Sequence, residues 1–143
     1  MRMIPIAVDT NTLVAAMLGK GPSASRTVIR RCLQGAYQPL IGAALFTKYQ
    51  AVMARASLFR QCSLTKAERE ALLNAFYRVC RWTPVYYSWR PNLPDEADNH
   101  ILEIAVAGGA VAIVTRNIRD FINAELGFPG IRILTPEKMI KEY

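Results

Sequence analysis

The chain has 143 residues, 52% of them hydrophobic, and this length and composition predict one compact domain with a single core rather than a disordered segment. No apolar stretch reaches the roughly 18 residues that a membrane span needs, and Asp9 interrupts the first apolar run before a signal-peptide core forms, so we expect a cytoplasmic protein with no membrane partner. Three cysteines without a paired spacing, Cys32, Cys62 and Cys80, favour reduced thiols over disulfides or a zinc site.

Positive charge is concentrated in one part of the sequence. The formal net charge is +7, and residues 10–67 contain no Asp or Glu. That stretch carries Lys20, Arg26, Arg30, Arg31, Lys48, Arg55, Arg60 and Lys66. A surface of one sign favours binding of a polyanion such as nucleic acid, because neutralised phosphates release their counterions. A basic solvated surface, or a groove for an acidic protein partner, explains the same pattern.

Apolar runs of strand length alternate with helical periodicity in the first half of the chain. Ile4 to Val8 predicts a buried strand, and a helix is expected over roughly Asn11 to Leu18, ended by Gly19. Ser23 is placed to cap a second helix that ends at Gly35. A short strand over Tyr37 to Ile41 and a helix from Ala43 to about Arg55 follow.

The second half continues the alternation. Thr65 and Glu68 form a capping box, which predicts a helix to about Arg81. Thr83 to Tyr87 has strand character, and the loop Ser88 to Pro94 contains two prolines. The remaining expected elements are a helix over Glu96 to Ala107, a strand over Ala110 to Thr115, a strand over Ile131 to Leu134, and a terminal helical turn or two over Pro136 to Tyr143. This order predicts an α/β fold with a mostly parallel sheet covered on both faces.

Acidic residues follow the predicted strands or begin a predicted helix. Asp9 closes the first strand, Asp95 and Asp98 begin a helix, and Asp120 follows the strand that ends near Val114. In open parallel sheets, ligands bind beyond the carboxyl ends of the strands. Carboxylates gathered there repel one another unless a cation neutralises them, so the pattern predicts a divalent metal site and phosphodiester chemistry.

Helix capping is the structural alternative for three of these acids. Asp9, Asp95 and Asp120 are each placed where Asp serves as an N-cap, in the last case for a short helix through Ile122 and Ala124. Asp98 differs, because Ile101, Leu102 and Ala105 follow it at helical spacing. It is therefore expected on the helix face that packs on the sheet, where an unpaired carboxylate is costly.

The ordered set of motifs resembles the PIN-domain nuclease family, specifically the VapC-like toxin components of bacterial toxin–antitoxin modules. The markers are Val8-Asp9-Thr10-Asn11, the run Asp98 to Ala105, the run Val114 to Phe121, and the closing run Gly130 to Glu137. The resemblance covers residues 1–143 and implies a single PIN-like domain, a three-layer α/β/α fold with about five mostly parallel strands. It also implies an acidic pocket that holds Mg²⁺ or Mn²⁺, hydrolysis of single-stranded RNA, an antitoxin partner and a homodimer.

Roles for individual residues follow from the resemblance. Asp9, Asp98 and Asp120 are the expected metal ligands, and with Asn117 they form the expected catalytic set. The family's acid after the fourth strand falls at Asn117 or Asp120. The expected substrate-binding residues are Asn11, Thr115, Arg116 and Arg119, and Thr115 is also expected to order the turn that follows it. Tyr49 or Trp89 is a candidate for stacking on unpaired bases, unless these side chains belong to the core.

One position departs from the family pattern. Lys48 occupies the place of a glutamate that the family usually carries on the helix after the second strand, and no nearby acid replaces it. We expect an ammonium group there to pair with Asp9 or Asp98 and to weaken cation binding. The leading hypothesis is a metal-dependent endoribonuclease. The alternatives are a degenerate PIN domain that binds RNA or a protein without cleavage, and a small-ligand or phosphate-binding α/β module in which Asp9 and Asp120 only cap helices.

Overall fold

The fold was analysed in a computed structural model, which describes residues 3–19, 23–85, 96–121, 128 and 130–143, with the backbone alone described for residues 96–99. Strands and helices alternate along the chain, as the sequence predicts. The elements are β1 (Ile4–Val8), α1 (Thr10–Leu18), α2 (Ala24–Leu33), β2 (Tyr37–Ile41), α3 (Ala43–Met53), the 3₁₀ helix η1 (Ala56–Phe59), α4 (Lys66–Val79), β3 (Arg81–Trp82), α5 (Glu96–Gly108), β4 (Ala112–Val114), the 3₁₀ helix η2 (Ile118–Phe121), β5 (Arg132–Leu134) and α7 (Pro136–Glu142).

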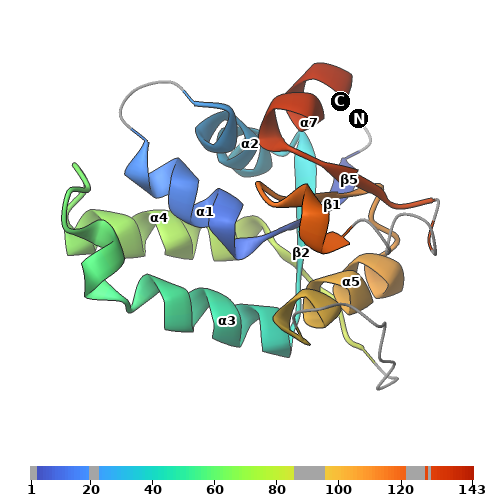
Figure 1. Cartoon of the computed structure of the whole chain (residues 1–143), viewed down its shortest axis with the longest axis horizontal. Coiled ribbons are helices and arrows are strands. Elements are labelled where there is room, and N and C mark those ends of the chain that lie inside the picture. The colour runs from blue at the N-terminus through green and yellow to red at the C-terminus, as the bar shows by residue number, and fades with distance from the viewer. Residues whose placement is uncertain (1–2, 20–22, 86–95, 122–127, 129) are drawn as a thin grey trace.

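The five strands form one sheet in the order β3-β2-β1-β4-β5, and every pair is parallel. Helices α2 and α7 lie together on one side of the strands, whereas α5 lies on the other side and packs on β1, β2 and β4 (Figure 1). This arrangement confirms the predicted three-layer α/β/α architecture with about five parallel strands. The buried core includes the strand residues Ile6, Val8, Leu40, Ile113 and Leu134.

The strand order places a topological switch point between β1 and β4. From β1 the chain adds β2 and β3 on one side, and then crosses back to add β4 and β5 on the other side. Val8 and Val114, the last residues of β1 and β4, are register partners. The segments that leave these two strands therefore begin side by side, which is where open α/β sheets form their binding crevices.

Local signals in the sequence start and end the helices. Ser23 Oγ accepts a hydrogen bond from the Arg26 N–H at 3.1 Å, and the Thr65 and Glu68 capping box is complete. Gly35 has a φ of +85°, a left-handed conformation that favours glycine, and it directs the chain from α2 into β2. These predicted boundaries are confirmed.

The strand predicted over Thr83 to Tyr87 is wrong for Thr83 to Val85, which form no strand, and the rest of that prediction lies outside the described residues. The preceding helix, predicted to run to about Arg81, ends two residues earlier. Helix α4 ends at Val79, and the strand is Arg81–Trp82, paired with Leu40 and Ile41. The Thr83 N–H still donates to Ile41 O at 2.7 Å, but Pro84 has no N–H with which to continue the ladder. The expected loop over Ser88 to Pro94 lies outside the described residues.

All three cysteines are free, as predicted, with Cys32 buried and Cys62 and Cys80 partly buried. Burial raises the pKa of the Cys80 thiol to about 12 and also raises the pKa of Cys32, so both stay protonated at neutral pH. In the part of the chain that the structure describes, no helix has the length and apolar character to cross a membrane.

Tyr49 belongs to the core and is not available to stack on bases. Its side chain is fully buried, its ring lies edge-on to Phe76 of α4, and its hydroxyl donates a hydrogen bond to Val8 O. Burial, and to a smaller extent the neighbouring Cys80 and Asp9, raises the pKa of Tyr49, so the hydroxyl remains a donor. This bond ties α3 to the carboxyl end of β1. Trp89, the other stacking candidate, lies outside the described residues.

We predict that Tyr49→Phe lowers the free energy of unfolding by about 1–3 kcal/mol, because the buried Val8 carbonyl loses its donor. Urea denaturation followed by circular dichroism measures the change. Tyr77→Phe is the matched control, since its hydroxyl accepts from Gln50 Nε2 near the surface and its loss is expected to cost much less. Equal denaturation midpoints for the wild type and Tyr49→Phe would contradict the proposed tie.

Candidate active site

Asp9 is held at the switch point by two hydrogen bonds. It directly follows β1 and is the N-cap of α1, where Oδ1 accepts the Thr10 N–H at 2.8 Å. Its other oxygen, Oδ2, accepts from the Thr115 hydroxyl at 2.7 Å. The residue is only 6% exposed. The capping role considered from the sequence is therefore real, and the second bond directs the same carboxylate toward β4.

Thr115 lies behind this carboxylate as the first residue after β4. Its side chain is fully buried, and Oγ1 accepts from the Asn117 N–H at 3.0 Å and from Asn11 Nδ2 at 3.4 Å. The Arg116 N–H in turn donates to Asn11 Oδ1 at 3.1 Å. These bonds connect the turn after β4 to the start of α1. Thr115 orders this turn as expected, but it touches Asp9 and presents no exposed surface to a substrate.

A second acid reaches the same site from the 3₁₀ helix after β4. Asp120 lies within η2, and its Oδ2 accepts from Asn117 Nδ2 at 2.7 Å. Both residues fall where the sequence placed the acid of the fourth turn. In the structure the amide orients the carboxylate. Asp120 is inside η2 rather than at its N-cap, and the short helix expected through Ile122 and Ala124 lies outside the described residues.

A pocket of about 470 Å³ opens at this point. Its walls come mainly from α1, α3 and the segment after β4. Four of the lining residues are charged, two of each sign: Asp9, Asp120, Lys48 and Arg116. The other lining residues are Thr10, Asn11, Val14, Ala15, Leu18 and Val52. The structure thus brings Asp9 and Asp120 to one pocket and includes Lys48 in its wall.

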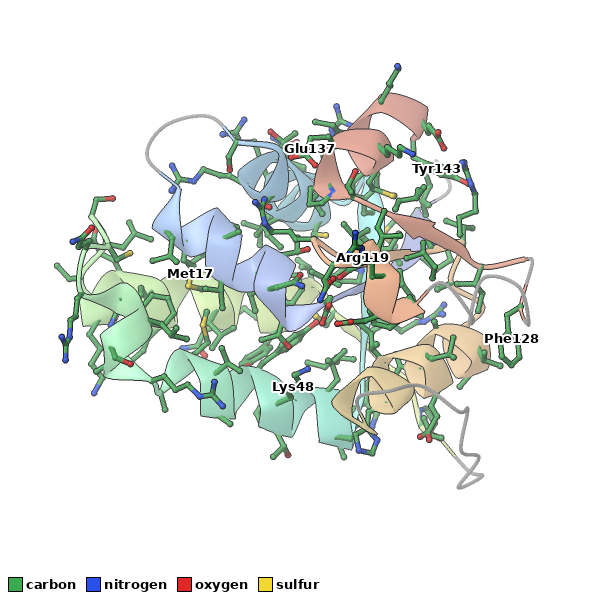
Figure 2. All side chains as sticks on the ribbon, in the orientation of Figure 1. Met17, Lys48, Arg119, Phe128, Glu137 and Tyr143 are labelled. Atoms are coloured by element: carbon green, nitrogen blue, oxygen red, sulfur yellow. The ribbon has the colours of Figure 1, made fainter. Side chains whose placement is uncertain are left out.

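Lys48 projects from the side of α3 that faces α1 (Figure 2). The side chain is partly exposed. Within the described part of the chain no ion pair joins it to Asp9 or Asp120. The expected ion pair of Lys48 with Asp9 does not form, and the Asp9 carboxylate accepts from Thr10 and Thr115 instead. Its expected alternative partner, Asp98, belongs to a part of α5 whose side chains are not described.

Asp98 lies in the first turns of α5, as the sequence predicts. Three and four residues further on, Ile101 and Leu102 are buried, and Ala105 is buried as well, so the helix packs on the sheet through the predicted face. The position of the Asp98 carboxylate is not described, and Asp95 lies outside the described residues. Convergence of Asp98 with Asp9 therefore stays a prediction.

The donor set suits a hard divalent cation. Carboxylates of Asp9 and Asp120 and amide oxygens of Asn11 and Asn117 are the kinds of ligand that Mg²⁺ and Mn²⁺ prefer. Beside Asp9, the buried Thr10 hydroxyl has no hydrogen-bond partner among the described residues, and a bound water or ion would satisfy it. The described residues alone contain no group of three or more acids, histidines or cysteines that could hold a metal. Asp98 is the further ligand that the resemblance predicts, and its role stays a prediction.

The two arginines near the site differ in position. Arg116 lines the pocket, and its guanidinium donates to Ser25 Oγ of α2 at 3.4 Å. Arg119, in η2, is exposed and is not among the described residues that line the pocket (Figure 2).

Sequence reasoning missed two supporting contacts. The Tyr49 hydroxyl bond to Val8 O fixes α3 next to the pocket, and the Thr12 hydroxyl donates to Val114 O at 3.3 Å, which joins α1 to the end of β4. The spacing of Leu45, Tyr49 and Val52, on one helical face, was the available signal that Tyr49 is buried. No sequence pattern indicated the Thr12 contact.

The fold and the site agree with the family comparison. A profile for the PIN domain matches residues 5–119, which is most of the chain and includes Asp9, Lys48, Asp98 and Asn117. The chain therefore belongs to the PIN-domain family, whose members are in general nucleases. None of the curated proteins matches it in sequence.

A solved structure with the same fold comes from Rickettsia felis. It is a chain of VapBC2, in a crystal structure of VapBC2 bound to a DNA fragment from the VapBC2 promoter. The two chains align with a TM-score of 0.57, over 92% of the present chain and 98% of the VapBC2 chain. The sequence identity is 15%, so this similarity shows a shared fold.

We predict that Thr115→Val lowers the free energy of unfolding by about 1–3 kcal/mol, because the Asp9 carboxylate and two donors lose a buried partner at nearly constant side-chain volume. Thr115→Ser, which keeps the hydroxyl, serves as the control and is expected to lose less. Chemical denaturation measures both. A Thr115→Val protein that unfolds at the wild-type denaturant concentration would show that the hydroxyl does not hold the site together.

Proposed function

We propose that this protein is a metal-dependent endoribonuclease that hydrolyses single-stranded RNA as the toxin of a toxin–antitoxin module. The observation that carries the proposal is the pocket at the β1 and β4 switch point, which combines Asp9 and Asp120 with Arg116. Membership in a nuclease family and the VapBC2 fold similarity support the same conclusion. Residues 10–67 carry basic side chains and no Asp or Glu, which supports a nucleic-acid substrate.

Asp9, Asp98 and Asp120 are the residues proposed to hold Mg²⁺ or Mn²⁺. When bound, the ion stabilises negative charge on the phosphate oxygens and lowers the pKa of a water molecule. Hydrolysis adds a water molecule to phosphorus and breaks one P–O ester bond. The chain's own contribution is orientation: Thr115 and Thr10 hold Asp9, and Asn117 holds Asp120.

Substrate binding is assigned to exposed or partly exposed groups around the pocket. Arg116 contacts the scissile region, Asn11 orients a substrate oxygen or water from the start of α1, and Arg119 contacts a flanking phosphate. Thr115, by contrast, is proposed to act through Asp9, because its hydroxyl is fully buried and already bonded. This assignment replaces the substrate-binding role expected for Thr115 from the sequence.

The proposal includes two protein partners. The fold similarity to VapBC2 supports an antitoxin partner, and we propose this partner and a homodimer for the chain, as the resemblance to VapC-like toxins implies. An enzyme that acts on cellular RNA is proposed to work in the cytoplasm.

Asp9→Asn is expected to abolish Mn²⁺-dependent cleavage of a fluorescent single-stranded RNA while the protein stays folded, because Asn preserves the helix cap but removes the negative charge. Asp98→Asn is expected to remove Mn²⁺ binding in calorimetry. Glu137→Gln, on α7 away from the pocket, is the matched control and should leave both activities unchanged. Undiminished cleavage by Asp9→Asn would refute the proposed metal site.

Asn117→Ala should weaken Mn²⁺ affinity and cleavage by about 10- to 100-fold, the usual cost of removing a group that orients a metal ligand. Calorimetry and the RNA cleavage assay measure these two effects separately. Loss of cleavage with unchanged Mn²⁺ affinity would instead assign Asn117 to the substrate.

A degenerate PIN domain that binds RNA or a protein without cutting is the second candidate, and Lys48 in the pocket wall favours it. It requires RNA binding that falls with salt and needs no metal. The discriminating result is an absence of cleavage by the wild type with Mn²⁺ together with cleavage by Lys48→Glu under the same conditions. Tight Mn²⁺ binding that disappears in Asp98→Asn would count against this candidate.

A further inference from the structure

The ammonium group of Lys48 is held at the pocket without a carboxylate partner in the described part of the chain. It lines the pocket together with Asp9, Arg116 and Asp120, yet no ion pair joins it to either of these acids. The side chain is partly exposed, so its charge is solvated and accessible from the pocket. A compact cation with three donors in this position is arranged to meet an anion that enters from solution.

The location of Lys48 is built into the fold. The adjacent Tyr49 is fully buried and bonded to Val8 O, one residue before Asp9, and Leu45 is buried one turn earlier. These contacts fix the backbone of α3 against the end of β1. The Lys48 side chain therefore extends from a fixed backbone position in the wall of the pocket that also contains Asp9.

We propose that Lys48, together with Arg116, binds a phosphate of single-stranded RNA directly in the pocket, so that substrate is held without a divalent ion. This inference rests on the RNA substrate of the proposed function, but it does not require cleavage. Hydrogen bonds from cationic groups to a phosphate are charge-assisted and stronger than neutral ones. Lys48 and Arg116 line the same pocket from α3 and from the turn after β4, and in the proposed complex one phosphate accepts from both.

The surface next to the pocket favours an RNA strand over a single isolated anion. A second hollow shares Leu18 with the pocket and continues past Leu58, Gln61 and Arg60. Arg60 in this second hollow is a further cation beyond Lys48, and we place the next phosphates of the strand there. No acid occurs anywhere in residues 10–67, which supply both α1 and α3.

The test is a fluorescence anisotropy titration of a labelled oligouridylate of about ten nucleotides, a length typical of single-strand sites, in EDTA over a series of salt concentrations. Lys48→Gln is expected to weaken binding about tenfold and to reduce the slope of log affinity against log salt by about 0.7, the value for one phosphate contact on a single strand. Lys48→Arg should keep the wild-type slope. Lys66→Gln, the same charge change on α4 outside the pocket, is the matched control.

Equal affinities and slopes for Lys48→Gln and Lys66→Gln would overturn the inference. The inference would also be overturned if oligoglutamate displaced the labelled RNA as effectively as unlabelled RNA of equal charge. That result would assign Lys48 to the binding of an acidic protein segment. Circular dichroism of each variant confirms that it is folded. Lys48→Glu adds an independent readout, since it should bind RNA more weakly than Lys48→Gln and bind Mn²⁺ more tightly in calorimetry.

Failure of the inference and failure of the proposed function have different signatures. A wild type that cleaves RNA with Mn²⁺ while Lys48→Gln binds like Lys66→Gln would retain the nuclease and reject the role of Lys48. A wild type that shows Lys48-dependent binding but never cleaves would retain the role of Lys48 and reject the nuclease.

Discussion

The hydrogen bond from Thr115 to Asp9 is the contact on which the candidate site depends. It joins the residue after β4 to the residue after β1, so it closes the switch point of the sheet. Because the two residues are far apart in the sequence, the bond exists only when β1 and β4 pair in register. The site is therefore assembled by the sheet, and the Asn11, Asn117 and Asp120 contacts are arranged around it.

Much of the fold was predictable from local patterns. The apolar runs of β1 and β2, the Ser23 and Thr65 caps and the glycine after α2 each act over a few residues, and each was located correctly. The third strand was predicted too late in the sequence because Val85 and the tyrosines after it are residues typical of strands. The actual strand β3 is determined by its pairing with Leu40 and Ile41 and by the missing N–H of Pro84. Pairing partners are a property of the tertiary fold.

The site was predictable in composition but less so in geometry. Asp9, Asp120 and Asn117 do meet at the carboxyl ends of β1 and β4, as residues that follow parallel strands must. The sequence did not show that Thr115 and Tyr49 are buried supports rather than surface contacts, because a hydroxyl has the same identity in either environment. Nor did the sequence show that Lys48 forms no ion pair with Asp9, since that outcome depends on which donors the fold places around the carboxylate.

The two hydrogen bonds of Asp9 also affect how its presence in related sequences should be interpreted. One of its oxygens caps α1 and the other accepts a hydrogen bond from the residue after β4, so the side chain stabilises the fold whether or not the protein hydrolyses RNA. Loss of catalytic ability would therefore not remove the structural reason to keep a side chain at this position that caps α1. The Asn117 and Asp120 pair begins no α-helix and holds no strand in register among the described residues. For the proposed nuclease, loss of that pair is therefore the more informative sign that hydrolysis has been lost.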